Sequence, residues 1–221
     1  MYEVVSGGAV MRRTRVKICG ITTARDAAVA VAAGVDALGV VFAPSSRQVS
    51  IEQARAVFAQ VPPMVARIGV FVDADESLVA KAVEGCGLAA VQFHGVESPE
   101  RCASAPVPVI KALRVGEDFD AAALEAYRGC VAAILLDTQV GERFGGTGRA
   151  FDWRQHVGVS PEWATLVLAG GLTPVNVGLA VRTLRPFAVD VSTGVEELPG
   201  HKDREKVHAF TAAVFAADQE G

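Results

Sequence analysis

Short runs of apolar, mostly β-branched residues alternate with alanine-rich stretches along this chain. The runs are continuous, with little alternation of polarity, which is typical of parallel strands buried on both faces. The predicted strands are Val16–Ile18, Ala37–Phe42, Ala66–Val72, Ala89–Phe93, Val107–Ala112, Ala132–Leu136, Leu166–Ala169 and Ala188–Val191. Helical patterns lie near Thr23–Ala33, Ile51–Gln60, Glu76–Gly85, Pro99–Ser104, Phe119–Tyr127, Asp152–Val157, Pro174–Thr183 and Asp203–Ala217. The pattern therefore predicts an α/β protein built from eight strand–helix units.

Strict alternation of strands and helices favours parallel pairing through crossover connections. Eight such units in 221 residues predict a single (β/α)8 barrel, the TIM-barrel architecture, at the short end of its usual length. An open, doubly wound sheet is the alternative, but it normally has fewer strands, and no G-x-G-x-x-G motif follows the first one. We expect residues 1–14 to form a flexible or loosely attached N-terminal extension and residues 15–221 to form the barrel.

Composition disfavours several classes of function. The chain is 51% hydrophobic and 21% charged, so it can bury a sizeable core. Its net charge of -4, without a basic run, argues against a nucleic-acid or membrane partner. The four cysteines lack C-x-x-C spacing, which predicts no metal site and favours a reduced, cytoplasmic protein. Neither a membrane span nor a signal-peptide core is present in the sequence.

Polar residues and glycines gather directly after the predicted strands. In a (β/α)8 barrel these eight strand ends share one rim, where the active site forms. The residues concerned are Cys19-Gly20, Ala43 to Arg47, Asp73, His94-Gly95, Arg114, Asp137-Thr138, Gly170-Gly171 and Ser192-Thr193-Gly194. The sequence therefore predicts a site assembled from residues that are far apart in the chain.

Cys19 and Asp137 are the candidate catalytic residues. Cys19 lies between the end of the first strand and the start of the next helix, and backbone N–H groups at a helix start favour the thiolate. Taken alone, a single cysteine is more often a small buried hydrophobe. Asp137 ends the sixth strand, at the mouth of an apolar barrel, where a carboxylate can serve as a general acid. The next predicted helix starts only near Asp152, so a capping role for Asp137 is disfavoured.

The loops after the seventh and eighth strands are candidates for binding phosphate. In (β/α)8 barrels these two loops often hold a phosphate group through backbone N–H groups. Gly170 and Gly171 let the main chain approach an anion, as Gly194 does, and Ser192 and Thr193 add hydroxyl donors. The glycine-rich loop at residues 145–148 could cover the site, or it could be an ordinary flexible loop.

Three further rim residues have a functional and a structural interpretation. Arg47 could bind a carboxylate bidentately or be a solvated loop residue. Asp190 could accept a hydrogen bond from a sugar hydroxyl or form a structural ion pair. His94 could do acid–base work or orient a neighbour, and a hydrogen-bonded structural histidine is at least as plausible. Asp73, Lys111 and Arg114 are also rim candidates, with weaker claims.

Together these motifs resemble one known family. They are Lys17-Ile18-Cys19-Gly20-Ile21-Thr22, Val91-Gln92-Phe93-His94-Gly95, Leu135-Leu136-Asp137-Thr138, Gly145-Gly146-Thr147-Gly148 with Phe151-Asp152-Trp153, Leu168-Ala169-Gly170-Gly171-Leu172, and Val189-Asp190-Val191-Ser192-Thr193-Gly194-Val195-Glu196. In this order, from about Val16 to Phe215, they resemble phosphoribosylanthranilate isomerase of tryptophan biosynthesis.

The resemblance implies a cofactor-free and metal-free Amadori rearrangement of N-(5-phosphoribosyl)anthranilate to 1-(2-carboxyphenylamino)-1-deoxyribulose 5-phosphate. It implies that Cys19 is the general base and Asp137 the general acid, and that Arg47 holds the anthranilate carboxylate. It also implies that Asp190 lies near the ribose hydroxyls and that the two glycine loops bind phosphate. Many relatives have proline where this chain has Ser46 and serine where it has Thr193.

Two other functions stay open on the sequence. A related isomerase of histidine biosynthesis runs the same rearrangement on a larger substrate with two phosphates, and it uses aspartate as the base where this chain has Cys19. A non-catalytic barrel that binds a phosphate ligand needs neither Cys19 nor Asp137. The sequence is compatible with a monomer or a homodimer.

Overall fold

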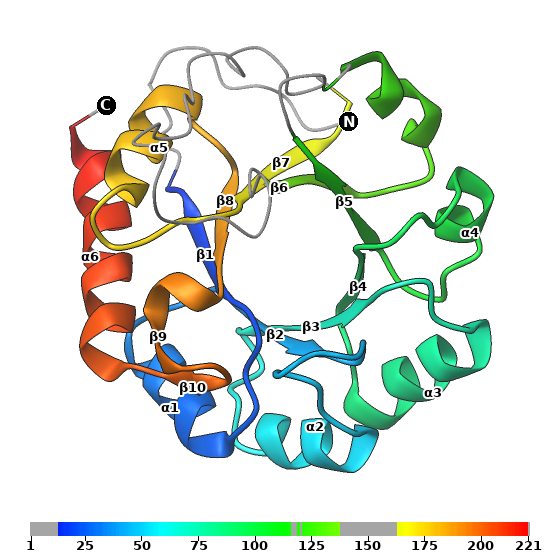
Figure 1. The fold of residues 1–221 in the computed structure, drawn as a ribbon, viewed down its shortest axis with the longest axis horizontal. Helices are drawn as coiled ribbons and strands as arrows, with labels where there is room; N and C mark the ends of the chain where they lie inside the picture. The colour runs from blue at the N-terminus through cyan, green and yellow to red at the C-terminus, as the bar shows by residue number, and fades with distance from the viewer. Residues whose placement is uncertain (1–12, 116–118, 120, 138–162, 221) are drawn as a thin grey trace.

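The computed structural model describes residues 13–115, 119, 121–137 and 163–220. Eight parallel strands close into a barrel in sequence order, and β1 pairs with both β2 and β8 (Figure 1). They are β1 (Arg15–Ile18), β2 (Ala37–Val41), β3 (Ala66–Phe71), β4 (Ala90–Phe93), β5 (Val109–Arg114), β6 (Ala133–Asp137), β7 (Thr165–Ala169) and β8 (Ala188–Val191). The predicted (β/α)8 barrel is confirmed, because the pairing of β8 with β1 excludes an open sheet.

Helices form a layer outside the barrel (Figure 1). The α-helices are α1 (Ala24–Ala32), α2 (Ile51–Phe58), α3 (Glu76–Cys86), α4 (Pro99–Ala103), α5 (Val177–Leu184) and α6 (Arg204–Gln219). Two 3-10 helices are η1 (Ala121–Tyr127) and η3 (Thr193–Val195). The predicted helix near Asp152–Val157, the glycine-rich loop at 145–148 and Thr138 lie outside the described residues.

Local sequence signals fix where the helices begin. The Thr23 hydroxyl accepts from the backbone N–H of Asp26 at the start of α1, and the Asp203 carboxylate does the same for Lys206 in α6. Ser50 and Gln53 form a reciprocal capping box at the start of α2. These caps position the helices that follow the strand-end loops.

The apolar core lies between the strands and the surrounding helices. Phe42, Phe71 and Phe93, from the ends of β2, β3 and β4, form one aromatic cluster. The first two rings are stacked with centroids 5.0 Å apart, and the second and third meet edge to face at 6.4 Å. This cluster fixes three neighbouring strand ends just below the rim.

Three segments differ from the sequence prediction. Strand β5 begins at Val109 and not at Val107, because Pro108 has no N–H to donate to a ladder. The segment before β6 is the 3-10 helix η1, whose three-residue repeat puts Leu124 and Tyr127 on one face against the core. The stretch from Pro199 to Asp203 reads in the sequence as the lead into the last helix, yet His201–Lys202 pairs with Glu196–Leu198 in a separate two-stranded sheet.

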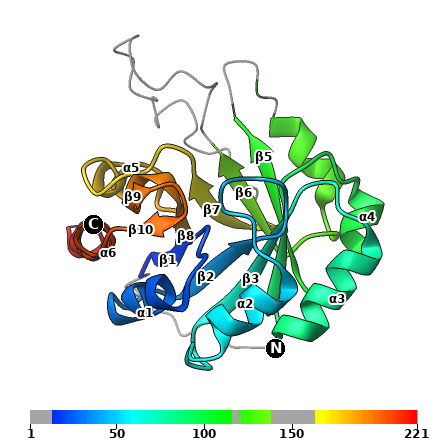
Figure 2. The same ribbon diagram turned by 60° about the horizontal axis from the view of Figure 1, so that its bottom comes forward.

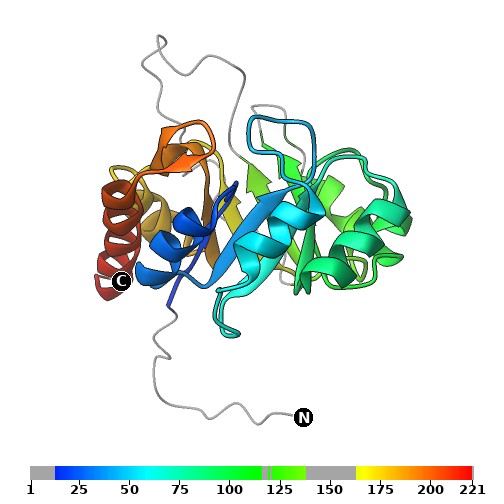
Figure 3. The ribbon, with the colours of Figure 1, turned by 90° about the horizontal axis from the view of Figure 1, so that it is seen from below.

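That sheet is an antiparallel hairpin of β9 (Glu196–Leu198) and β10 (His201–Lys202). Gly200 has a φ of +83°, which suits the turn, and its carbonyl oxygen accepts from the Thr22 hydroxyl at 2.6 Å. The hairpin and the loop after β2 stand at the end of the barrel where the strands finish (Figure 3). The hairpin thereby adds side chains to the rim.

Residues 13 and 14, within the predicted extension, contact the barrel. Thr14 is buried, and both its N–H and its hydroxyl donate to the Asp218 carboxylate in α6 at 2.7 Å. Arg13 pairs with Asp36 just before β2. The attachment of the chain to the barrel therefore begins at least two residues before β1.

Candidate active site at the barrel rim

The barrel brings the sequence-predicted residues to one rim. Cys19 follows β1, Arg47 lies in the loop after β2, His94 follows β4, Asp137 ends β6 and Asp190 lies within β8. Figure 2 and Figure 3 show the strand ends, the loop after β2 and the β9–β10 hairpin on the same side of the molecule. The rim is the C-terminal face of the strands, where (β/α)8 enzymes carry their chemistry.

Cys19 is buried above a charged side chain. Its backbone N–H donates to the carbonyl oxygen of Val191, which ties the end of β1 to the end of β8. Lys17 lies two residues earlier in the same strand, so its side chain points to the same face. The Lys17 Nζ lies 2.7 Å from the Asp190 Oδ2 in a pair that is almost fully buried. The thiol therefore lies next to a buried ion pair.

Burial and charge act in opposite directions on these groups. Burial raises the pKa of the Cys19 thiol, and the neighbouring Lys17 ammonium opposes that rise. Burial disfavours the charged form of Lys17, but the attraction of Asp190 outweighs this and raises the pKa of Lys17. The ammonium therefore stays charged beside the thiol.

Asp190 forms a structural ion pair, one of the two roles that the sequence allowed, because its Oδ2 contacts the Lys17 Nζ. Its second oxygen, Oδ1, is buried and accepts no hydrogen bond from any residue that the structure describes. A buried acceptor without a partner is unusual in folded proteins. The Oδ1 atom therefore stays available to accept a hydrogen bond from a substrate hydroxyl, even though Oδ2 is in the ion pair.

His94 and Asp137 contact each other across the rim. The His94 Nε2 lies 3.1 Å from the Asp137 Oδ2, and the His94 Nδ1 lies 3.4 Å from the Gln92 Nε2. Gln92 is the residue two positions before His94 in the same strand segment. The structure thus gives His94 an orienting contact with the candidate acid, which its position in the sequence alone left undecided.

Arg47 forms a bidentate pair with Glu196 of the hairpin. Its Nε and Nη2 donate to the two carboxylate oxygens at 2.7 and 2.6 Å. The stem of Arg47 crosses over Gly20, where a Cβ would lie 2.5 Å from the Arg47 Cδ and 3.0 Å from the Ser192 Oγ. Gly20 also has a φ of +72°, so both space and backbone require glycine there. Arg47 is therefore a fixed rim residue, not a solvated loop arginine.

Glu196 also binds a second cation. The Lys202 Nζ donates to the Glu196 Oε1 at 2.8 Å, and both side chains are buried. Burial alone would raise the pKa of Glu196, but the hydrogen bonds from Arg47 and Lys202 outweigh it and lower that pKa to about 2. Burial lowers the pKa of Lys202, and Glu196 offsets part of that effect.

The two glycine loops pack against each other as the phosphate hypothesis requires. Gly170 and Gly171 have φ values of +88° and +60°, which few other residues adopt. A Cβ on Gly194 would overlap the carbonyl oxygen of Leu172, so the turn of η3 presses directly on the loop after β7. The structure therefore brings these loops together without testing what they bind.

Two of the weaker rim candidates, Lys111 and Asp73, have structural partners. The Lys111 Nζ pairs with Glu97 at 2.8 Å and donates to the carbonyl oxygen of Gly95 at 2.7 Å. Glu97 also accepts from the backbone N–H groups of Asp73 and Gly95, and these bonds outweigh its burial and lower its pKa. This cluster ties together the loops after β3 and β4.

Four residues that the sequence reasoning did not assign shape the site: Lys17, Gln92, Glu196 and Lys202. Lys17 and Gln92 are polar residues inside apolar strands, each two positions before a candidate residue on the same face. That spacing was a usable signal for both. Glu196 and Lys202 belong to the hairpin that the sequence did not predict; Glu196 ends one of the family motifs, but neither residue was given a role.

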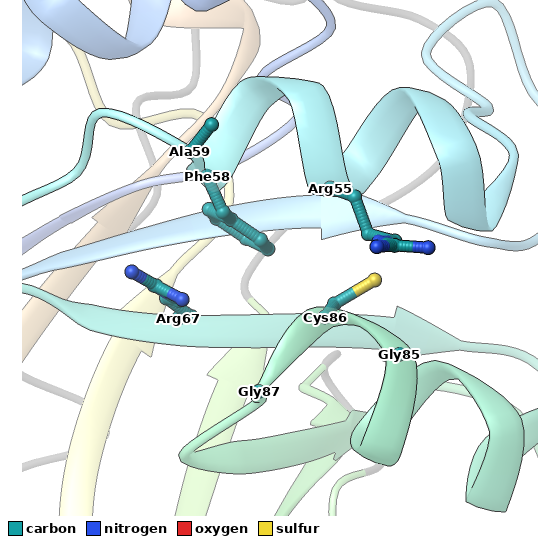
Figure 4. Close-up of a pocket in the computed structure, with 7 residues that line it drawn as sticks. All are labelled: Arg55, Phe58, Ala59, Arg67, Gly85, Cys86 and Gly87. Carbon is teal, nitrogen blue, oxygen red and sulfur yellow. The ribbon is translucent and has the colours of Figure 1, made fainter.

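One open hollow on the described surface lies away from the rim. It has a volume of about 310 Å³ and lies between α2, the start of β3 and the end of α3. Figure 4 shows Arg55, Phe58, Arg67 and Cys86 around it. A second, apolar cavity of about 200 Å³ lies in the barrel at the starts of the strands. No predicted site residue lines either space.

Two general features of the described residues bear on function. No group of three or more His, Cys, Asp or Glu side chains among them is arranged to hold a metal ion. No helix in the same part of the chain is long and apolar enough to cross a membrane.

Comparison with known proteins gives a consistent result. Residues 16–213 match the family model described as N-(5'-phosphoribosyl)anthranilate (PRA) isomerase. The chain is 50% identical over 208 residues to the N-(5'-phosphoribosyl)anthranilate isomerase of Pseudomonas fluorescens, which covers 92% of this chain and 97% of that protein.

Solved structures agree with the sequence comparison. Phosphoribosyl anthranilate isomerase from Thermotoga maritima superposes with a TM-score of 0.84 at 43% identity, covering 91% of this chain and 98% of that chain. A structure of such an isomerase in complex with reduced 1-(o-carboxyphenylamino)-1-deoxyribulose 5-phosphate has a TM-score of 0.82 at 41% identity, with the same coverage.

Proposed function

Because the chain belongs to the N-(5'-phosphoribosyl)anthranilate isomerase family, we propose that it converts N-(5-phosphoribosyl)anthranilate to 1-(2-carboxyphenylamino)-1-deoxyribulose 5-phosphate in tryptophan biosynthesis. The reaction is an Amadori rearrangement, an aldose–ketose isomerisation that needs an acid and a base. The observation that supports it within this chain is a thiol and a carboxylate at one rim, the thiol next to the buried Lys17–Asp190 pair and the carboxylate in contact with His94. Cys19 is the base and Asp137 the acid.

In this mechanism Asp137 first donates a proton to the ring oxygen of the ribose. The bond between C1 and that oxygen breaks as the nitrogen lone pair forms a protonated imine at C1. The Cys19 thiolate then removes the proton from C2, and the C–H electron pair becomes the C1–C2 double bond of an enolamine. Loss of the O2 proton and protonation of C1 give the ketone. General acid and base steps of this kind contribute about 10²–10⁴-fold each.

The substrate carries two anionic groups, and the rim offers a place for each. Arg47 has five N–H donors, of which Glu196 occupies two, so other donors can bind the anthranilate carboxylate. The loops at Gly170–Gly171 and Ser192–Gly194 bind the phosphate, with the hydroxyl of Thr193 in place of a serine. Asp190 accepts a hydrogen bond from a ribose hydroxyl through its unpartnered oxygen.

The proposed function is tested by the loss of fluorescence of freshly made phosphoribosylanthranilate when the protein is added. Cys19→Ala and Asp137→Asn should each keep the far-UV circular dichroism of the parent and lose most of kcat. Normal turnover in either variant would remove that residue from the mechanism, and no turnover by the parent protein would overturn the proposed activity. A two-phosphate aminoaldose substrate, tested in parallel, should not turn over.

Assembly and location remain predictions. We expect a monomer or a homodimer, which light scattering on the purified protein distinguishes by mass. A cytoplasmic location is expected from the free cysteines, and fractionation of cells that make the protein tests it.

A further inference from the structure

Lys17 is a buried charged residue between the apolar residues Val16 and Ile18 of β1. It is 4% exposed, and its Nζ contacts the Asp190 Oδ2 at 2.7 Å and the Gln92 Oε1 at 3.0 Å. Taking an ammonium out of water is costly even when it is paired, and well-packed apolar residues often replace buried ion pairs without loss of stability. Fold stability alone therefore does not account for this side chain.

The Lys17 ammonium shares one small space with the Cys19 thiol. A Cβ placed on Gly39 of β2 would lie 2.9 Å from the Cys19 Sγ and 3.1 Å from the Lys17 Nζ. The sulfur and the ammonium nitrogen therefore lie close to the same point. There is room for both because residue 39 is a glycine and has no side chain. The other charged groups that act on Cys19 are Asp190 from β8, Lys202 from β10 and Arg47 from the loop after β2.

The second contact of Lys17 determines a chain of hydrogen bonds toward Asp137. An ammonium only donates, so the Gln92 oxygen must face Lys17 and the Gln92 NH2 must face the His94 Nδ1. The His94 Nδ1 is then an acceptor, and in the neutral imidazole the proton lies on Nε2. The Nε2–H donates to the Asp137 Oδ2 at 3.1 Å. The tautomer of His94 follows from the charge of Lys17, two side chains away.

We propose that Lys17 is a positioning residue for both members of the catalytic pair: its ammonium stabilises the Cys19 thiolate, and its hydrogen bond to Gln92 holds His94 in the Nε2–H tautomer that orients Asp137. This inference rests on the roles given to Cys19 and Asp137 by the proposed function. The ammonium of Lys17 thus acts on two residues of the rim, directly on Cys19 and through Gln92 and His94 on Asp137.

The first test follows the ionisation of Cys19 without substrate. Thiolate ultraviolet absorbance and the rate of iodoacetamide alkylation are measured against pH, with Cys19→Ser subtracted to remove the other three cysteines. In Lys17→Met the titration of Cys19 should move about one pH unit upward. Because that variant leaves Asp190 unpaired, Lys17→Met with Asp190→Asn is a second variant, and a smaller upward shift is expected from it.

Lys111→Met is the matched control. Lys111 lies buried in β5 and pairs with Glu97 at 2.8 Å, and among the described residues no contact joins it to Cys19. Its replacement also breaks a buried ion pair, so it reproduces the structural damage and should leave the Cys19 titration in place. An equal shift in Lys111→Met, or no shift in either Lys17 variant, would overturn the role at the thiol.

The second test reads the His94 tautomer by long-range ¹H–¹⁵N spectra of the imidazole, assigned with His94→Gln. The parent protein should show the Nε2–H form, and Lys17→Met and Gln92→Leu should both show the Nδ1–H form as well. Gln92→Leu should leave the Cys19 titration nearly unchanged. An unaltered tautomer in both variants would overturn the role at Asp137.

Kinetics complete the test. Lys17→Met should lower kcat about 10–100-fold and change KM less than about threefold, with part of the rate regained at higher pH. A KM effect alone contradicts the proposal. The titration and the spectra need no substrate, so failure of the proposed activity and failure of this inference give different results.

Discussion

Replacing Glu196 by glutamine tests how one buried carboxylate holds two cations at the rim. Glu196 accepts from Arg47 at 2.7 and 2.6 Å and from Lys202 at 2.8 Å. Its pKa falls from 4.5 to about 2, and at 1.36 kcal/mol per unit this corresponds to about 3 kcal/mol. Breaking a buried pair by removing one partner costs a similar amount, about 3–5 kcal/mol. We therefore expect Glu196→Gln to lose about 3 kcal/mol of unfolding free energy at neutral pH.

The pH dependence of this difference has a definite sign. The folded-state pKa of Glu196 lies below its unfolded value, so the stabilisation is complete above about pH 4.5 and declines as the pH falls. It is about half lost near pH 3 and gone below the folded pKa of about 2. Glutamine does not titrate, so the gap between the two proteins should narrow as the pH falls.

The assay is urea unfolding followed by far-UV circular dichroism at pH 7, 4.5 and about 3. Glu197→Gln is the control, because Glu197 is the next residue in β9 and is exposed, and it should change stability by less than about 0.5 kcal/mol. Glu196→Gln should also raise KM, since the guanidinium of Arg47 loses its bidentate partner. Equal stability of the two variants, or a difference that does not depend on pH, would refute the reasoning.

Two further predictions concern substrate binding. Arg47→Ala should raise KM about 10–100-fold with a smaller change in kcat, because it removes binding of the substrate carboxylate; an unchanged KM in steady-state kinetics contradicts that role. Gly194→Ala should raise KM and weaken competitive inhibition by inorganic phosphate, since its Cβ would overlap the Leu172 carbonyl oxygen. Gly178→Ala in α5, where the nearest atom lies 3.5 Å from the added Cβ, is the control and should bind phosphate as the parent does.

The barrel was predictable because its signal is local. Most strands are continuous apolar runs, and parallel strands buried on both faces have that pattern. The observed bounds of β8 agree with the prediction, and β5 starts two residues late because of Pro108 and ends two residues later, at Arg114. The hairpin of β9 and β10 escaped prediction because strands of three and two residues carry too little pattern, and Glu196 and Glu197 are not typical of strands.

The sequence predicted where the site residues lie, but not which other residues they contact. Strand ends of a (β/α)8 barrel meet at one rim, so Cys19 and Asp137 could be assigned to it from the sequence. Their neighbours could not, because the contacts are long-range: Lys17 pairs with a residue 173 positions away, and Arg47 with one 149 positions away. Which of several charges at the rim pair with one another depends on strand register and side-chain length.

The pairing of the rim charges explains why ionic side chains are kept in an otherwise apolar barrel. Apolar residues of similar volume often replace a buried ion pair without loss of stability, so stability gives no reason to retain Lys17 with Asp190 or Arg47 with Glu196. The proposed reaction does, because a cationic imine forms and disappears beside a carboxylate and a phosphate. Charges held in place by fixed partners stabilise such changes without rearranging during each step. Within each pair, each charge therefore holds its partner in place while the reaction proceeds.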